Sequence, residues 1–577
     1  MVVRPAPTGD GSLVLSSTRA FTPPASFTDL LLSTPAISLV GQGGRLQTFA
    51  IRGLGQERIR VMLNDAPLKP LRRAGVSAAF LNPAWFRVLV QPVSAPVAQG
   101  SGSLGGNILA APMEQLPDQV SVTYEGSGNA RTVNANFSAG NSLFGLGHQQ
   151  MDDQNAADGT RLNTSFEQSS LLMQHRAQVA SADSITTLSF SDGTDVGKSN
   201  IDYPERITNY PTDQHIFVSQ ELASQHLGKL SGWLHKQKLE TKTLRDGVRT
   251  DVNTEVLDYG LRFARDMTIS DVDEIHWGLD MFGRHDFDVK ENDANTLRDG
   301  EELELGAFLE GVRHVNNWSL GYGIRLLHGQ MDSEDQSDVD TSRILGHASV
   351  GWQSGSSFSW RFKTHRATTL PTVGQLFFTG TTGRGAVIGN AELNAEDAWI
   401  YEFSTRSTFA FIDASLSAFY MDIDSFITKL AITDDIDSFR NADGGEIYGF
   451  NGEVAAEIAD VRIEAGFSTL RGELDNGDAM RDIPANQATL RLRWPLLSGS
   501  AAMELAQRFE SDRVADDNRQ EDARSLINAS YQRQLGERLT VTIFGRNLLD
   551  ELYYVSGDRK SALGPERTFG ISLNARI

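Results

Sequence analysis

The 577-residue sequence contains no cysteine. Disulfide frameworks, thiolate metal sites and cysteine nucleophiles are therefore excluded. The sequence also lacks any run close to the ~18 apolar residues that a membrane-spanning helix needs, which excludes a helical transporter. Positive charge is scarce, with 52 basic against 74 acidic residues and a net charge of -22, and this argues against a nucleic-acid binder.

The first residues also lack the features of a secretory signal peptide. Met1–Pro5 are followed by no apolar core of the required length. Taken alone, this start predicts a cytoplasmic protein. The patterns in the rest of the sequence nevertheless predict an exported one.

From about Asp118 onward, apolar and polar residues alternate in segments of roughly ten residues separated by turn formers. Successive side chains of a strand point to opposite faces, so each segment has one apolar and one polar face. One segment carries its apolar residues at Trp318, Leu320, Tyr322, Ile324 and Leu326. Similar segments occur at 412–420, 461–467, 488–494 and 569–577.

The connections between these segments are of two kinds, tight turns such as Ala459-Asp460 and long polar stretches. The long ones are 147–168, 192–214, 331–341, 368–396 and 433–446. Alternating short and long connections are typical of a transmembrane barrel. With about 21 residues for each strand and its connection, the ~460 residues after the first ~115 predict about 22 strands.

Alternation of this kind also fits a soluble β-sandwich or propeller. A secreted β protein that binds or cleaves polysaccharide is therefore the alternative from another functional class. The pattern changes character only once, near residue 115, and charged residues stand at strand centres. Both features favour one barrel whose lumen is filled by polar protein.

The first ~115 residues predict a small α+β unit. Ser26 is a suitable N-cap for a short helix that Pro35 ends, and Asp29 stands at the position of a capping box. Runs rich in β-branched residues predict strands at 48–52, 58–64 and 87–90. The glycine-dense segment 100–108 predicts a turn, because no Gly-Lys-Ser/Thr sequence follows it.

Several collinear motifs carry a family resemblance. They are Gln47–Gly53, Arg58–Pro67, Asn82–Val88 and Gly100–Ile108 near the start, and Gly545–Asp550 and Gly564–Phe569 near the end. In this order they resemble the TonB-dependent outer-membrane receptors. The resemblance implies a plug at 1–115 inside a 22-stranded antiparallel transmembrane β-barrel at 116–577, a mainly β protein of the outer membrane of a Gram-negative bacterium.

The resemblance also implies function and partners. Members of the family import scarce ligands such as ferric siderophores, haem or cobalamin, and a TonB-type inner-membrane complex drives the import by displacing the plug. The implied surroundings are outer-membrane lipid and lipopolysaccharide, with no nucleic acid, and a monomer is expected. Within residues 1–10, Val2 and Val3 resemble a remnant of the motif that TonB grips.

The plug departs from the family pattern at the strand 87–90. Phe86 and Leu89 stand where relatives carry glutamates that hold the plug to the barrel. We therefore expect Arg52 and Arg58 to hold the plug instead, by meeting carboxylates of the lumen.

The ligand is expected at three plug loops, Gly53–Glu57, Pro67–Val76 and Asn82–Trp85. The second loop is basic in an otherwise acidic chain and suits an anionic ferric chelate. The predicted ligand-binding residues of the plug are Gln56, Glu57, Lys69, Arg72, Arg73, Asn82 and Trp85. A barrel loop adds Arg366, Phe377 and Phe378, although strand-end aromatic residues also form the interface girdle of barrels.

A haem receptor of the same family is the alternative ligand class. Haem iron needs an axial ligand, and no histidine lies between Arg366 and Leu393, where haem receptors carry one. A ferric siderophore is therefore the predicted ligand. The sequence predicts neither an enzyme nor a protein-bound metal or covalent cofactor, because no catalytic or metal-ligand spacing is present.

Overall fold

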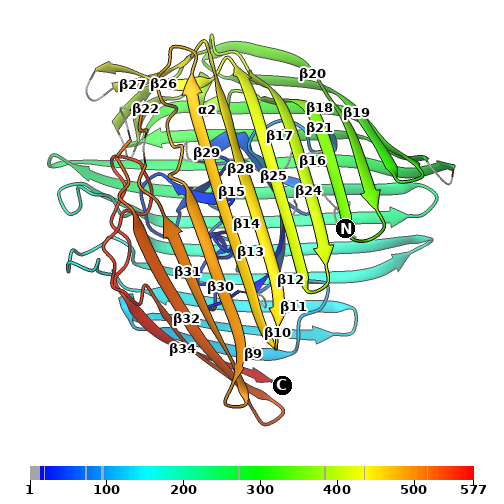
Figure 1. Ribbon diagram of the computed structural model, residues 1–577. Coiled ribbons are helices and arrows are strands. Elements are labelled where there is room, and N and C mark those ends of the chain that lie inside the picture. Colours follow the sequence, from blue (N-terminus) through cyan, green and yellow to red (C-terminus); the bar gives the residue numbers. More distant parts are fainter. Residues whose placement is uncertain are drawn as a thin grey trace.

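A computed structural model describes residues 13–17, 20–71, 75–92, 97–270, 273–382, 385–433, 436–511, 513–515 and 518–577. Among these residues, no helix has the length and apolar character needed to span a bilayer. Figure 1 shows a barrel of long strands that surrounds the N-terminal part of the chain.

The N-terminal unit contains a five-stranded sheet in the order β1-β7-β8-β5-β6 and a smaller sheet β2-β3-β4. β5 and β8 pair in parallel, and the other pairs are antiparallel. Its strands are β1 (Leu13–Leu15), β2 (Ile37–Val40), β3 (Thr48–Ile51), β4 (Leu54–Gly55), β5 (Ile59–Leu63), β6 (Ala66–Leu68), β7 (Phe86–Gln91) and β8 (Gly106–Pro112). The described part of this unit also contains the 3₁₀ turns η2 (Gln56–Arg58) and η3 (Val97–Gln99).

The helix α1 (Phe27–Leu31) forms where the sequence predicts it. The Ser26 hydroxyl accepts from the Asp29 N–H, and the Asp29 carboxylate accepts from the Ser26 N–H. This capping box satisfies two of the donors that a helix start leaves unpaired. The helix buries Phe27, Leu30 and Leu31 in a core that also includes residues of the barrel wall, such as Phe217 and Trp233.

The second unit is a closed barrel of 22 strands, as predicted, in which each strand pairs with its neighbours and β34 closes onto β9. The plug ends at β8, and the predicted boundary at 115/116 falls before β9. The first strands are β9 (Gln119–Glu125), β10 (Ala130–Ala139), β11 (Ser142–Met151), β12 (Phe166–Val179), β13 (Ala182–Gly197), β14 (Ile207–Ser224), β15 (Gly228–Arg245) and β16 (Val248–Ser270). Next come β17 (Asp273–Glu291), β18 (Ala294–Val315), β19 (Trp318–Ser333), β20 (Gln336–Ser354), β21 (Phe358–Thr369), β24 (Glu396–Phe409) and β25 (Ile412–Asp424). The last are β28 (Gly444–Ile458), β29 (Val461–Leu474), β30 (Gln487–Leu496), β31 (Gly499–Arg508), β32 (Arg524–Leu535), β33 (Leu539–Arg546) and β34 (Thr568–Arg576), and the 3₁₀ turn η4 (Ser127–Asn129) joins β9 to β10.

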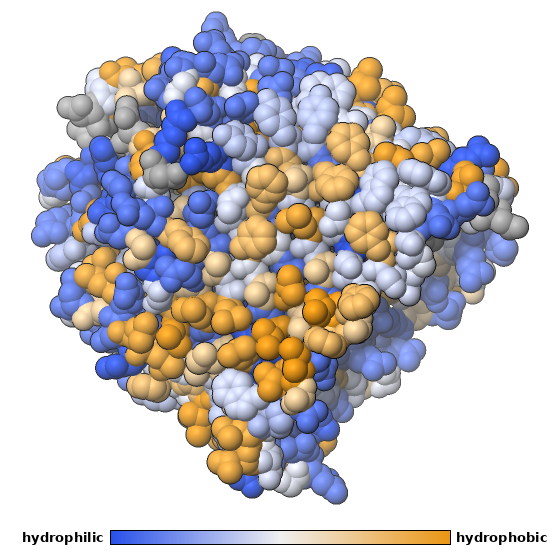
Figure 2. Space-filling view, in the orientation of Figure 1, coloured by the Kyte–Doolittle hydropathy of each residue, from blue (hydrophilic) through white to orange (hydrophobic). Residues whose placement is uncertain are grey.

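The predicted alternation sets which side chains face outward. On β19, Ile324 and Leu326 are 50% and 55% exposed, whereas Arg325 between them is 1% exposed and faces the lumen. Figure 2 shows apolar side chains gathered over β28–β32 on the viewed face, while hydrophilic residues dominate at the top and along the left edge. The barrel therefore has an apolar exterior and a polar, protein-filled lumen.

The two ends of the barrel differ in their connections. At one end, here called the short-turn end, hairpins such as Ala459-Asp460 join the strands, as predicted. At the other, the long-loop end, the structure differs from the prediction. β11–β14 and β19–β20 extend into the stretches 147–168, 192–214 and 331–341.

A separate lid stands at the long-loop end. The sequence predicts only loops at 368–396 and 433–446 there, and one lid strand, β26 (Ile427–Thr433), begins before the second of them. The lid is the helix α2 (Val373–Leu376) with the sheet β22-β23-β27-β26, formed by β22 (Thr379–Thr382), β23 (Gly385–Ile388), β26 and β27 (Ile436–Asn441). Figure 1 shows this sheet at the upper left. Phe377, Phe378 and Phe439 form its apolar core with residues of β16–β19, and Leu71 of the plug packs against this core.

Candidate functional site

Arg52 and Arg58 of the plug both contact carboxylates of β24, as predicted. Arg52 Nη2 lies 3.0 Å from Glu402 Oε1, and its guanidinium stands 4.0 Å from the ring centre of Phe419. Arg58 binds Glu396 at both carboxylate oxygens, with Nη2–Oε1 and Nε–Oε2 distances of 2.5 and 2.9 Å. Buried arginine–carboxylate pairs of this kind fix the position of the plug against the wall.

Lys69 is predicted to bind the ligand, but the structure places it in a second contact between plug and barrel. Its Nζ lies 2.7 Å from Glu302 and 2.6 Å from Glu304, two lumenal carboxylates of β18. Burial alone would lower the pKa of Lys69, yet the two carboxylates raise it above its usual value. The ammonium is therefore charged and already paired, so the expectation that it faces the ligand is wrong.

A third contact was not expected from the sequence. Asp65 of the plug pairs with Lys229 and accepts a hydrogen bond from Ser231 Oγ at 2.6 Å. Lys229 also binds Glu221 at 3.0 Å. Burial alone would raise the pKa of Asp65, but Lys229 brings it well below its usual range. Arg60 adds a weaker pair with Glu304 at 4.0 Å. We call the contacts of Lys69, Asp65 and Arg60 with β15 and β18 the latch.

Among the described residues, the plug surface at the long-loop end is formed by 53–57, 67–71, Gly75 and Val76. Gly75 has φ +94°, and a Cβ there would stand 2.6 Å from Gln56 Cα, so only glycine allows the two loops to touch. Gln56 and Glu57 are half-buried at this contact. Burial raises the pKa of Glu57 to about 7, since the nearby charges of Arg58, Glu396 and Lys69 partly cancel. Of the predicted ligand-binding residues, Gln56 and Glu57 are thus the ones that the structure leaves at the plug surface of the long-loop end.

Asn82 and Trp85 are predicted to face the ligand, and the structure contradicts this. Trp85 is 1% exposed, and its indole N–H donates to Asn136 Oδ1 at 2.7 Å. Asn82 donates to Asn134 Oδ1 at 2.7 Å. Both partners lie on β10, so these side chains join plug to wall below the outer surface.

The three predicted barrel residues also lie elsewhere. Phe377 and Phe378 are 3% and 6% exposed in the core of the lid, so they present little surface to a ligand and form no exterior girdle. Arg366 pairs with Asp397 at 3.4 Å, on the strand face opposite to the buried, lumen-facing His365. Arg366, predicted to bind the ligand from a barrel loop, instead lies within the strand β21 and is already paired with Asp397.

Comparison with known proteins decides the family. A family model for the TonB dependent receptor-like β-barrel matches residues 112–548, and one for the TonB-dependent receptor plug domain matches residues 18–107. The chain belongs to the TonB-dependent receptors. A search of curated protein sequences finds no match.

Solved structures of other TonB-dependent receptors share the fold. The copper transporter OprC is 14% identical with a TM-score of 0.86, covering 98% of this chain and 99% of that one. The FrpB iron transporter from Neisseria meningitidis is 14% identical with a TM-score of 0.79, covering 99% and 100%. The siderophore receptor PirA from Acinetobacter baumannii is 12% identical with a TM-score of 0.76, covering 98% of each chain. At these identities the likeness concerns the fold.

Membership fixes the orientation of this TonB-dependent receptor. The family lies in the outer membrane of Gram-negative bacteria and works with TonB and a bound ligand. Short turns face the periplasm and long loops face outward. The lid and the contact between Gln56 and Gly75 therefore face the outside, where a ligand arrives.

Four predicted residues lie outside the described residues, namely Val2, Val3, Arg72 and Arg73. Sequence reasoning also missed Arg45, whose guanidinium donates to Gln149 and Gln168 of the wall at 2.6 and 2.7 Å. Burial lowers the pKa of Arg45 to about 10. Its neighbours Gly41–Gly44 give no local sign of such a role, since the partners lie over 100 residues away.

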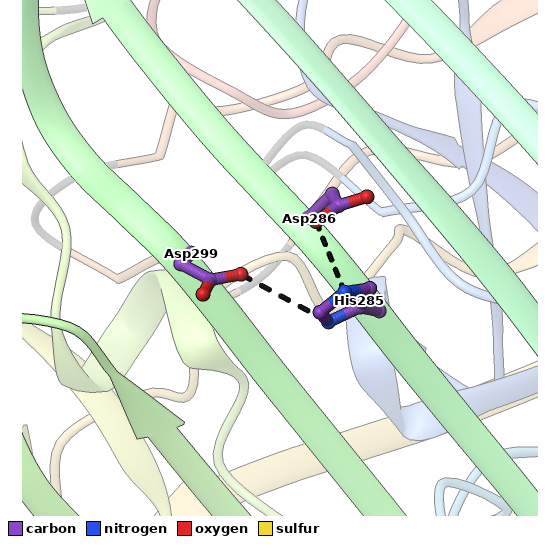
Figure 3. A group of neighbouring side chains, drawn as sticks. All are labelled: His285, Asp286 and Asp299. Carbon is purple, nitrogen blue, oxygen red and sulfur yellow. Dashed lines mark ion pairs between the residues drawn. The ribbon is translucent and has the colours of Figure 1, made fainter.

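The receptor also has a group of metal-ligand type outside its lumen. His285, Asp286 and Asp299 place ligand atoms within 4.8 Å of one another, and Figure 3 shows the imidazole between the two carboxylates. His285 Nδ1 also lies 2.5 Å from Glu301 Oε1. His285, Asp286 and Asp299 are exposed on β17 and β18, while the adjacent Arg284 is buried in the lumen with Asp258. The cluster is therefore not part of a path through the barrel.

Proposed function

We propose that this receptor imports a ferric siderophore, which binds at the outer face of the plug and enters when TonB displaces the plug. The observation that carries the proposal is the filled lumen. The core of the plug continues into the barrel wall, and buried ion pairs hold it there. A solute cannot diffuse through such a lumen, so passage requires work from a partner.

Two further observations support an iron chelate as the cargo. FrpB is named as an iron transporter and PirA as a siderophore receptor, and both share the fold over nearly the whole chain. The sequence of the plug also contains Arg72 and Arg73, two adjacent cations that suit an anionic chelate. The haem alternative is the second candidate, since the hemophore receptor HasR shares the fold as well. The sequence favours it less, because its first histidine is His148, beyond the plug.

Growth under iron limitation tests the proposal. Cells that depend on this receptor would be given ⁵⁵Fe bound to a hydroxamate, a catecholate or citrate, one at a time. We expect growth and uptake with at least one of these chelates. Failure with all three, together with normal receptor levels in the outer membrane, would reject iron import.

The role of the plug arginines is tested on the same cells. Arg72→Ala combined with Arg73→Ala should weaken surface binding of the accepted chelate without loss of folded receptor. The matched control is Arg161→Ala, which removes an exposed arginine that pairs with Asp153 in an outer barrel loop. Equal binding by the double variant and the control would remove Arg72 and Arg73 from the site.

A further inference from the structure

A large cavity lies between the plug and one side of the barrel wall. Its volume is about 810 Å³, which is within the range of pockets that hold small ligands. The plug lines it with β1, Phe21, residues 33–36 and Arg52, and the wall lines it with β24, β25, β28, β29 and β30.

The cavity stands toward the periplasm. Asp413, Arg462 and Arg493 line it, and each lies within a few residues of a short turn. The outer part of the same wall is closed, because Arg58 and Arg52 bind Glu396 and Glu402 on β24. The cavity is thus below the plug contacts that a bound ligand would have to pass.

The lining is polar and rich in arginine. Five arginines line it against three carboxylates, in a chain whose net charge is -22. Arg491 and Arg493 both lie over the ring of Phe21, at 5.2 and 5.1 Å from its centre. Within the described residues, Arg406 and Arg493 have no carboxylate within 4.0 Å, so they are available to an anion.

The opposite side of the wall holds the plug much more firmly. There the latch joins Lys69 to Glu302 and Glu304, and Asp65 to Lys229. Separating buried pairs leaves charges without partners, which is costly. On the cavity side below Arg52, the polar contacts are fewer, such as those of Thr34 with Glu453 and of Gln487 with the Pro35 carbonyl.

We propose that the cavity is the exit route of a small anionic chelate, and that the plug separates from β25 and β28–β30 while the latch side stays attached. This inference rests on the proposed function. It adds which side of the plug opens and which charge the transported chelate carries. The chelate would move from the plug apex past Arg52 to Arg406 and Arg493. It would then enter the periplasm between β1 and the wall.

Engineered disulfides test the route cleanly, because the chain contains no cysteine of its own. In a disulfide, each Cβ stands about 3 Å from the partner sulfur, as bond lengths and angles require. A Cβ at Gly466 on β29 would stand 3.0 Å from Pro35 Cγ. The pair Pro35→Cys and Gly466→Cys therefore locks the cavity side.

The matched lock joins the plug to the other half of the wall. A Cβ at Gly43 would stand 3.3 Å from the Cβ of Ser199, between β13 and β14. Uptake of ⁵⁵Fe bound to a hydroxamate, a catecholate or citrate is measured for both double variants, oxidised and after reduction. We expect the cavity lock to lower uptake at least tenfold when oxidised and to recover on reduction, and the control lock to keep at least half.

Equal inhibition by both locks, or full uptake through the oxidised cavity lock, would overturn the route. A cysteine-free parent that takes up none of the chelates would instead reject the proposed function, and the route with it. A second test measures uptake by Thr489→Trp, which narrows the cavity. Its control is Leu490→Trp, on the exterior face of the same strand. Lower uptake with Thr489→Trp alone is expected, and equal uptake by the two variants would also overturn the route.

Discussion

At the residue scale, Glu57 is a carboxyl near the plug surface whose charge changes near neutral pH. Burial raises its pKa from 4.5 to about 7. Between these values the folded chain binds a proton that the unfolded chain has released, so stability falls as pH rises from 4.5 to 7 and is level above it.

The variant Glu57→Gln should remove this dependence. We expect the wild type to lose up to about 3 kcal/mol of plug stability between pH 4.5 and 8 that the variant does not lose. Calorimetry of the purified receptor across this range measures the difference, with Glu205→Gln in an exposed loop as control. Parallel pH profiles for wild type and Glu57→Gln would contradict the assignment.

Lys69 carries the second prediction at this scale. Lys69→Met leaves Glu302 and Glu304 without their shared cation, and removing one partner of a buried pair costs about 3–5 kcal/mol. Lys238→Met breaks the more exposed pair with Glu240 and should cost less than about 1 kcal/mol. Denaturation midpoints of the purified receptor measure both. Similar losses for the two lysines would show that the Lys69 contact does not hold the plug.

These residues mark the limit of sequence reasoning. Arg52 and Arg58 were predictable as wall contacts, because the usual glutamates are missing from the strand at 86–91. Lys69 was not, since its partners lie more than 230 positions away and a basic loop residue gives the same local signal whether it meets a ligand or a carboxylate. Trp85 was placed at the ligand for a similar reason, since a loop tryptophan looks the same in the sequence whether it meets a ligand or, as here, Asn136 of the wall.

At the scale of elements, the strands follow from the sequence and the lid does not. Period-two alternation is local, so the segments at 318–326 and 461–467 fall on β19 and β29. The lid joins strands from two separate loops, including the parallel pair β23–β27. Such pairing depends on contacts between distant segments, and no local pattern predicts it.

The lid core yields the third prediction. Phe377→Ala removes a ring that is 3% exposed, and large cavities of this kind cost about 3–5 kcal/mol. We expect faster proteolysis within 370–395 with an unchanged barrel. Phe409→Ala, at a turn where the ring is 75% exposed, is the control. Equal cleavage rates in the two variants would mean that Phe377 does not support the lid.

At the scale of the whole molecule, the protein is a closed 22-stranded barrel whose plug is held by the latch on one side. On the other side, Arg52 and Arg58 hold the plug above a cavity. Chain length and strand spacing predicted only an approximate number of strands, and the value of 22 came from the family resemblance. The asymmetry of the plug contacts was not, because it depends on which lumenal side chains from distant strands meet the plug.

The central claim is that the filled lumen makes import depend on energy from TonB. Binding and uptake of the accepted ⁵⁵Fe chelate in otherwise identical cells with and without TonB test it most directly. We predict equal surface binding in both and uptake only where TonB is present. Uptake that continues at the same rate without TonB would contradict the claim.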